Sequence, residues 1–154
     1  MSIMQPQPLI TRCLALGVFD LFHIGHLNYL AFAKAQGDEL LVAVAPDAVC
    51  LAKKQALPII NQVERLAIVR ALAIVKEAYL LPCPIKETAA ACAWIKAWGI
   101  NKIVVGEQWQ GAEQWQRLAE ALQDDDITVM FAPKTPSISS TDIKAKIRRE
   151  PYQC

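Results

Sequence analysis

The sequence predicts one α/β domain of the doubly wound, Rossmann-like class over residues 1–154, built on a five-stranded parallel sheet. Five short apolar runs are typical of strands that are buried on both faces. The segments between them have helical periodicity, and strands that alternate with helices favour a parallel sheet covered on both sides. No linker, repeat or low-complexity segment interrupts the alternation. We expect residues 1–11, which contain two prolines, to be a loosely ordered N-terminal segment.

The first half of the chain supplies three of the predicted strands. The continuous apolar run at 13–18 is the first, and a helix over 23–36 follows it, closed by Gly37 as a C-terminal cap. Pro46 and Asp47 mark a turn, and Asp47 is placed to cap a short helix. The other elements predicted here are strands at 40–45 and 77–81, helices at 48–52 and 62–73, and a loop at 53–61.

The second half continues the same pattern. A helix over 88–98 is ended by Gly99, and a final helix over 141–149 carries basic residues at its end, where the helix dipole favours them. The remaining predicted elements are strands at 102–105 and 127–131 and a helix at 112–122. In such a sheet, ligands bind at the carboxyl ends of the strands, near the point where the strand order reverses. The loops that follow the strands are therefore the candidate site.

Composition excludes several classes of protein. The chain is 54% apolar, which excludes whole-chain disorder, and its 16 Lys and Arg against 15 Asp and Glu disfavour a general nucleic-acid binder. Cysteines at 13, 50, 83, 92 and 154 form no CxxC pair, so we expect neither a zinc site nor a disulfide framework. No apolar run of 18 residues and no targeting signal occurs, so we expect a cytoplasmic protein without a membrane span.

The first strand runs into the segment GVFDLFHIGH at 17–26, which holds the two histidines of the chain. His23 and His26 are three residues apart, which places both imidazoles on one face of a helix. A helix start offers unpaired N–H groups and the positive end of the dipole, and Gly25 lets an anion approach the backbone. The segment therefore predicts a phosphate site. Asp20 is expected either to cap the first helix or to orient a neighbouring residue, and capping is the preferred interpretation.

This segment resembles the G-x-F-D-x-x-H-x-G-H signature of the nucleotidyltransferase superfamily, and within it the cytidylyltransferases, with glycerol-3-phosphate cytidylyltransferases as the nearest likeness. The similarity extends over nearly the whole chain. The later segments that carry it are 33–47, Lys54 with Pro58, Glu64 with Arg65, GEQW at 106–109 and TPSISSTDIKAKI at 135–147.

The resemblance implies transfer of CMP from CTP to a small phosphorylated alcohol, with release of pyrophosphate and no covalent intermediate. It assigns catalytic roles to His23, His26 and Lys54, and it makes Arg65 a ligand of the substrate phosphate. The nucleotide-binding residues that it implies are Gly17, Val18, Phe19, Asp20, Gly25, Lys53, Gly106, Glu107, Gln108, Trp109, Lys134, Thr135, Ser139, Ser140 and Thr141. Triphosphate chemistry implies Mg²⁺ without resident protein ligands. The apolar helix faces favour a homodimer; no nucleic-acid or membrane partner is expected.

Several alternatives remain open. Glu107 and Gln108 replace the paired acids of the cytidylyltransferases in the region expected to read the base. An adenylyltransferase of the same superfamily, acting on flavin or nicotinamide mononucleotide, is the alternative activity; a non-catalytic nucleotide-binding subunit is another. Arg65 could instead pair with Glu64 on a solvated helix face. The three acids at 124–126 are expected to form a solvated turn, not a metal cluster.

Overall fold

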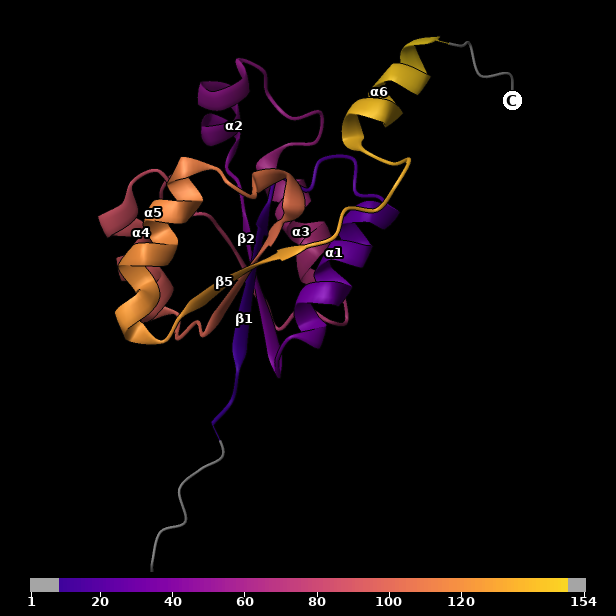
Figure 1. Ribbon diagram of the computed structural model, residues 1–154. Helices are drawn as coiled ribbons and strands as arrows, with labels where there is room; N and C mark the ends of the chain where they lie inside the picture. Colours follow the sequence, from indigo (N-terminus) through magenta and orange to yellow (C-terminus); the bar gives the residue numbers. More distant parts are fainter. Residues whose placement is uncertain (1–8, 150–154) are drawn as a thin grey trace, which may run out of the picture.

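The computed structural model (Figure 1) describes residues 9–149. Within them, five parallel strands form one sheet in the order β3-β2-β1-β4-β5. The strands are β1 (Arg12–Gly17), β2 (Glu39–Val44), β3 (Glu77–Leu80), β4 (Lys102–Gly106) and β5 (Thr128–Ala132). The helices are α1 (Ile24–Ala35), α2 (Asp47–Lys54), α3 (Gln62–Arg70), α4 (Thr88–Ala97), α5 (Glu113–Leu122) and α6 (Ser140–Arg149), with 3₁₀ turns η1 (Glu107–Trp109) and η2 (Gln123–Asp125). The predicted doubly wound α/β class is confirmed. The expected segment at 1–11 and Cys154 fall largely or wholly outside the described residues.

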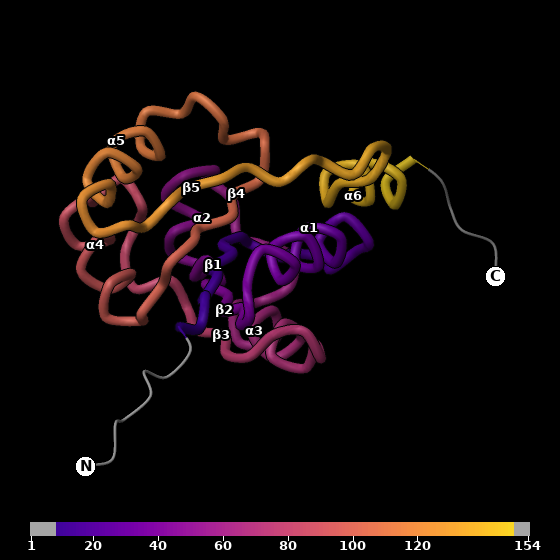
Figure 2. Tube along the Cα trace, turned by 60° about the horizontal axis from the view of Figure 1, so that its bottom comes forward, coloured from indigo at the N-terminus to yellow at the C-terminus, as the bar shows by residue number. Residues whose placement is uncertain are grey.

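Two apolar layers hold the sheet between its helices. Alternate side chains of a strand point to opposite faces, so neighbours such as Cys13 and Leu14 of β1 enter different layers. On one face α1 and α3 pack through residues such as Leu30 and Val69, both fully buried. On the other, α4 and α5 pack through residues such as Leu118. Figure 2 shows the two helix layers on either side of the central strands.

The order of the strands determines where a ligand site can form. From central β1 the chain moves outward through β2 to β3, then crosses to β4 and β5 on the other side. Strand order therefore reverses between β1 and β4. Their pairing covers only Cys13↔Lys102 to Ala15↔Val104, so the two strands separate beyond Ala15. We refer to the region at their carboxyl ends, where sheets of this kind bind ligands, as the crevice.

Most predicted elements lie within a few residues of their observed bounds, and α2 is the main correction. It extends over Asp47–Lys54, so Lys53 and Lys54 stand on a helix and not in the predicted loop. Gln55 ends the helix in the left-handed conformation at φ 54, a position for which the sequence carries no glycine. The helix predicted over 62–73 ends at Arg70. None of the helices in residues 9–149 is long and apolar enough to span a membrane.

Candidate active site at the β1/β4 crevice

The fork between β1 and β4 is closed by the side chain of Tyr29. Its hydroxyl accepts a hydrogen bond from the backbone N–H of Leu16 at 3.1 Å and donates one to the carbonyl oxygen of Val104. Burial raises the pKa of Tyr29 far above its ordinary value, so the hydroxyl keeps its proton. The side chain therefore satisfies backbone groups that lose their strand partners where the sheet opens, and it fixes α1 beneath the crevice.

The two histidines are locked together at the start of α1. Nδ1 of His23 accepts a hydrogen bond from the backbone N–H of Gly25 at 3.0 Å, and Nδ1 of His26 accepts one from the backbone N–H of His23 at 3.2 Å. The rings stack with centroids 3.8 Å apart. Because both Nδ1 atoms are acceptors, each neutral ring carries its proton on Nε2, which remains free to donate.

Electrostatics keep these rings neutral. Burial, with a smaller contribution from the nearby His23, lowers the pKa of His26 to about 4. Burial also lowers the pKa of His23. The pair therefore presents two neutral N–H donors at neutral pH, at a helix N-terminus that itself favours negative charge. Such a pair suits phosphate oxygens.

Gly25 is required by the packing around the cap. A Cβ atom at this position would lie 2.8 Å from Cε1 of His23 and 3.2 Å from Cγ2 of Ile138. The first contact is closer than real Cβ atoms approach, so any larger residue would displace the His23 ring. The second shows that the segment before α6 packs against the start of α1. Glycine thus allows the ring cap and the C-terminal segment to meet.

The turn that carries the histidines is shaped by Phe19 and Asp20. Phe19 is buried and has a positive φ of 56, a conformation that L-residues rarely adopt, and its ring packs edge-on against His26 at 5.5 Å. The Asp20 carboxylate accepts hydrogen bonds from the backbone N–H groups of Ile59 (2.8 Å) and Ile60 (2.9 Å). Asp20 therefore fixes the loop after α2, and the expectation that it caps α1 is wrong, since His23 is the cap.

The protonation of Asp20 follows from these contacts. Burial opposes the charged form, but the hydrogen bonds from Ile60 and Ile59 and the charge of Lys144, 3.6 Å away, lower the pKa of the carboxyl group. Asp20 is consequently an anion that binds two other segments of the chain, the loop after α2 and helix α6. Ser140 adds a further link by donating to the Asp20 carbonyl oxygen at 2.7 Å. The first turns of α6 are thereby held beside the histidine turn.

Arg65 lies fully buried beneath this loop, and its position corrects both interpretations made from the sequence. Its guanidinium donates to the carbonyl oxygens of Ile60, Val18 and Ala45 and to Oδ1 of Asp47 at 2.7 Å. Those bonds occupy nearly all of its donors, and no surface remains for a substrate phosphate. Nor does it pair with Glu64 on a solvated face. Arg65 ties together the loops that follow β1 and β2.

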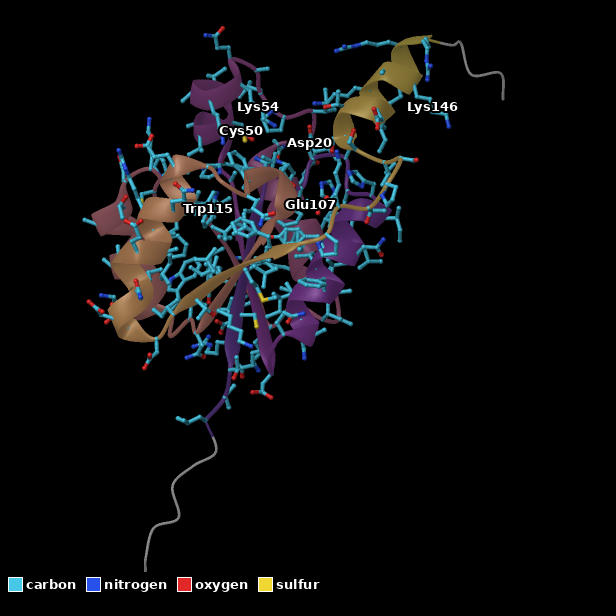
Figure 3. The ribbon with its side chains drawn as sticks, in the orientation of Figure 1. Asp20, Cys50, Lys54, Glu107, Trp115 and Lys146 are labelled. Atoms are coloured by element: carbon cyan, nitrogen blue, oxygen red, sulfur yellow. The ribbon has the colours of Figure 1, made fainter. Side chains whose placement is uncertain are left out.

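The far side of the crevice is formed by α2 and η1. Nζ of Lys53 lies 3.5 Å from the centroid of the Trp109 ring, a cation–π contact between the two elements. Burial and the nearby Lys54 lower the pKa of Lys53. Lys54 is exposed at the last residue of α2, and Figure 3 shows it at the same end of the molecule as Asp20. The structure thus brings both lysines to the carboxyl edge, with Lys53 in contact with Trp109.

The other predicted nucleotide-binding residues lie on the same edge. Gly106 ends β4, and Glu107 and Gln108 are exposed in η1. Thr135 accepts a hydrogen bond from Asn28 of α1 at 3.1 Å, and Ser139 Oγ accepts one from the Asp142 N–H at 3.0 Å, capping α6. Lys134 and Thr141 are exposed beside them, and Gly17 lies under the Phe19 ring.

Tyr29, Asp47 and Ile138 hold the site together but were not predicted from the sequence as site residues. For Tyr29 a signal exists, because it lies three residues after His26 and therefore on the same helix face. For Asp47, the partner of Arg65, and Ile138, the neighbour of Gly25, only the fold shows the contact. The structure thus gathers neutral N–H donors, lysines and a helix N-terminus at the carboxyl edge of the sheet. This arrangement can bind a polyphosphate and hold its reacting phosphorus against two imidazole N–H groups.

Comparison with known proteins agrees with this chemistry. The model of the family described as "Cytidylyltransferase-like" matches residues 14–146. The chain belongs to this family. Its nucleotidyltransferase superfamily, predicted from the histidine segment, is thereby confirmed.

The chain is also similar to curated proteins that are named FAD synthase. It is 45% identical over 69 residues to an FAD synthase of Thermococcus onnurineus and 47% identical over 76 residues to one of Methanosarcina mazei. The matches cover 45% and 49% of this chain and 46% and 49% of those relatives, so they span about half the length of each protein.

Solved structures extend the likeness. A "lipopolysaccharide core biosynthesis protein" of Thermoplasma volcanium is 28% identical with a TM-score of 0.64, covering 82% of this chain and 97% of the other. A pantoate-beta-alanine ligase of Francisella tularensis, solved with β,γ-ATP and β-alanine, is 16% identical with a TM-score of 0.54, covering 90% of this chain and 69% of the other. At that identity the second match shows the fold alone.

These relatives correct the activity predicted from the sequence. The interpretation of the family member as a CTP-dependent enzyme acting on a glycerol-3-phosphate-like alcohol is wrong, because the matched proteins are FAD synthases. One feature of the sequence disfavoured the cytidylyltransferase interpretation: Glu107 and Gln108 replace the paired acids expected of a cytidylyltransferase. The homodimer and the cytoplasmic location stay predictions.

Proposed function

We propose that this protein transfers the adenylyl group of ATP to the phosphate of a flavin mononucleotide, forming FAD and pyrophosphate. The observation that carries the proposal is the 42–48% identity to FAD synthases over about half the chain. The crevice described above supports it, because it offers neutral donors and a helix N-terminus to a triphosphate. Nucleotidyl transfer itself follows from membership of the family.

In the proposed reaction an oxygen of the acceptor phosphate attacks the α-phosphorus of ATP. The bond from that phosphorus to the oxygen bridging the α- and β-phosphates breaks, and pyrophosphate leaves with the electron pair. Negative charge grows on the oxygens around phosphorus and on the leaving group, so catalysis depends on positioning and on cationic or N–H donors. No side chain needs to form a covalent intermediate.

Each group in the crevice has a place in this scheme. The Nε2–H groups of His23 and His26 donate to oxygens of the reacting phosphate, and their Nδ1 bonds fix both rings before ATP arrives. The N-terminus of α6, with Ser139 and Thr141, binds the β- and γ-phosphates of the leaving group. Lys54 contributes positive charge from the end of α2.

A divalent cation fits this site as part of the substrate. Among residues 9–149, no group of three or more His, Cys, Asp or Glu side chains is arranged to hold a metal ion. Mg²⁺ is commonly held by substrate phosphates and a few waters, with little from the protein. We therefore propose that Mg²⁺ enters bound to the triphosphate, where it neutralises phosphate charge.

A matrix of nucleotides and acceptors tests the proposal. The protein is incubated with ATP, CTP, GTP or UTP, each with Mg²⁺ and with FMN, nicotinamide mononucleotide or glycerol-3-phosphate, and pyrophosphate release is measured. We expect release with ATP and FMN, together with FAD as the chromatographed product. Release with ATP only when nicotinamide mononucleotide is the acceptor, or no release in any combination, would contradict the proposal.

A further inference from the structure

The ammonium group of Lys53 covers a face of the Trp109 ring, and it has no other charged partner in the described part of the chain. Nζ of Lys53 lies 3.5 Å from the ring centroid, and none of the ion pairs within residues 9–149 involves Lys53. Trp109 is half-buried in η1, directly after β4, and it packs against the apolar core between the sheet and α4 and α5, while Lys53 covers a face of its ring. An ammonium group over an indole is a contact that a stronger anion can displace.

The geometry of transfer places the acceptor on this side of the crevice. In phosphoryl-type transfer the attacking and leaving oxygens lie roughly in line across the reacting phosphorus. The leaving pyrophosphate is expected at the start of α6, where Ser140 is bonded to the Asp20 carbonyl oxygen. Figure 3 shows Asp20 between Lys54 of α2 and Lys146 of α6. The acceptor must then approach from the α2 side, where Lys53 and Trp109 meet.

We propose that Trp109 is the stacking platform for the planar ring of the acceptor, and that Lys53 covers the platform until the acceptor phosphate draws it away. This inference rests on the proposed function and specifies how the acceptor is selected. It assigns Lys53 and Trp109 to the acceptor, whereas the resemblance implied that they bind the nucleoside triphosphate. A planar aromatic phosphomonoester satisfies both groups at once: its ring takes the indole face, and its phosphate takes the ammonium. An aliphatic alcohol phosphate would displace Lys53 and leave the indole face exposed to water.

The chain offers a matched control for this platform. Trp98 directly follows α4. Because helices run antiparallel to the strands they cover, Trp98 lies at the edge of the sheet opposite the crevice. Its ring centroid is 4.6 Å from that of Trp94 and 5.3 Å from that of Tyr79. Trp98→Leu therefore removes a tryptophan without touching the platform. Trp109→Phe retains a smaller ring, and Trp109→Leu removes it.

Binding is measured with FMN and with riboflavin, which has the ring but no phosphate, by quenching of flavin fluorescence in the absence of ATP. We expect Trp109→Leu to weaken FMN binding roughly tenfold and to abolish most of the quenching, Trp109→Phe to fall between, and Trp98→Leu to match the parent chain. In turnover, Trp109→Leu should raise the KM for FMN by a similar factor and leave the KM for ATP within twofold.

Lys53→Met separates the two parts of the proposal. It should bind riboflavin at least as tightly as the parent chain, because the indole face is uncovered, and should lose most of the preference for FMN over riboflavin. Unchanged FMN binding by Trp109→Leu in a chain that makes FAD would overturn the inference and leave the proposed function standing. Failure of the parent chain to bind FMN or to make FAD would overturn both.

Discussion

Replacing Gly25 by alanine separates the geometry of the site from the stability of the fold. The added Cβ atom would meet the His23 ring at 2.8–2.9 Å, so the ring must move by a few tenths of an ångström or more, and the bond from the Gly25 N–H to Nδ1 weakens. Loss of a cap costs about 1 kcal/mol, whereas alanine in place of glycine within a helix contributes about 0.5–1 kcal/mol. The net change in the free energy of unfolding should stay within about 1 kcal/mol.

Turnover should respond far more strongly. A displaced His23 no longer directs Nε2 at the reacting phosphate, and misplacement of a positioned group by about 1 Å can cost 10²-fold. We therefore expect kcat for pyrophosphate release to fall on the order of 10²-fold in Gly25→Ala, with urea unfolding nearly unchanged. In a His23→Asn background the ring is gone and only the 3.2 Å contact with Cγ2 of Ile138 remains, so adding Gly25→Ala should be less unfavourable for stability than it is in the parent chain. Parent-like turnover, or the same stability effect in both backgrounds, would refute this reasoning.

Two further predictions concern stability. Because burial and the nearby His23 lower the pKa of His26 to about 4, the unfolded chain binds more protons than the folded chain between pH 4 and 6.5. The free energy of unfolding should therefore fall by about 2–3 kcal/mol as the pH drops through that window, allowing for the partial exposure of the ring, and urea unfolding of His26→Asn should show little of this dependence. Arg65→Met should lose about 3–5 kcal/mol, since three carbonyl oxygens and the Asp47 carboxylate lose their donor. A loss below 1 kcal/mol with a raised KM for FMN would restore Arg65 as a phosphate ligand.

The fold and the histidine turn could be predicted because their signals are local. Apolar runs such as that of β1 are continuous in the sequence, and alternation with helices restricts the topology to a parallel sheet. The spacing of His23 and His26 fixes their common face, and the structure adds that the same spacing lets each ring cap the turn through Nδ1. The local spacing of the histidines therefore predicts both the position of the site and its hydrogen-bond donors.

The roles of Asp20 and Arg65 could not be predicted because their partners are distant in the sequence. Asp20 binds backbone groups 39 and 40 residues away, and Arg65 binds Val18 at a separation of 47 residues. From neighbouring residues alone, the first resembles a helix cap and the second an exposed half of an ion pair. The extent of α2 was missed for another reason: Gln55 adopts a left-handed conformation without the glycine that usually marks it.

The histidine segment does not determine which nucleotide base or which acceptor the protein binds. The phosphate chemistry is common to the superfamily, and fold does not fix substrate. Glu107 and Gln108, which replace the paired acids of the cytidylyltransferases, lie in η1, and the contact between Lys53 and Trp109 joins η1 to α2. The proposed substrate therefore rests on the relatives, and the proposed stacking platform rests on the contact between α2 and η1.

The most direct measurement of the central claim is single-turnover adenylyl transfer by His26→Ala under saturating ATP and FMN. If two neutral imidazole N–H groups hold the reacting phosphate, loss of one donor should slow transfer on the order of 10²–10³-fold while circular dichroism stays that of the parent chain. A rate within threefold of the parent chain would show that the paired rings at the start of α1 are not the groups on which the reaction depends.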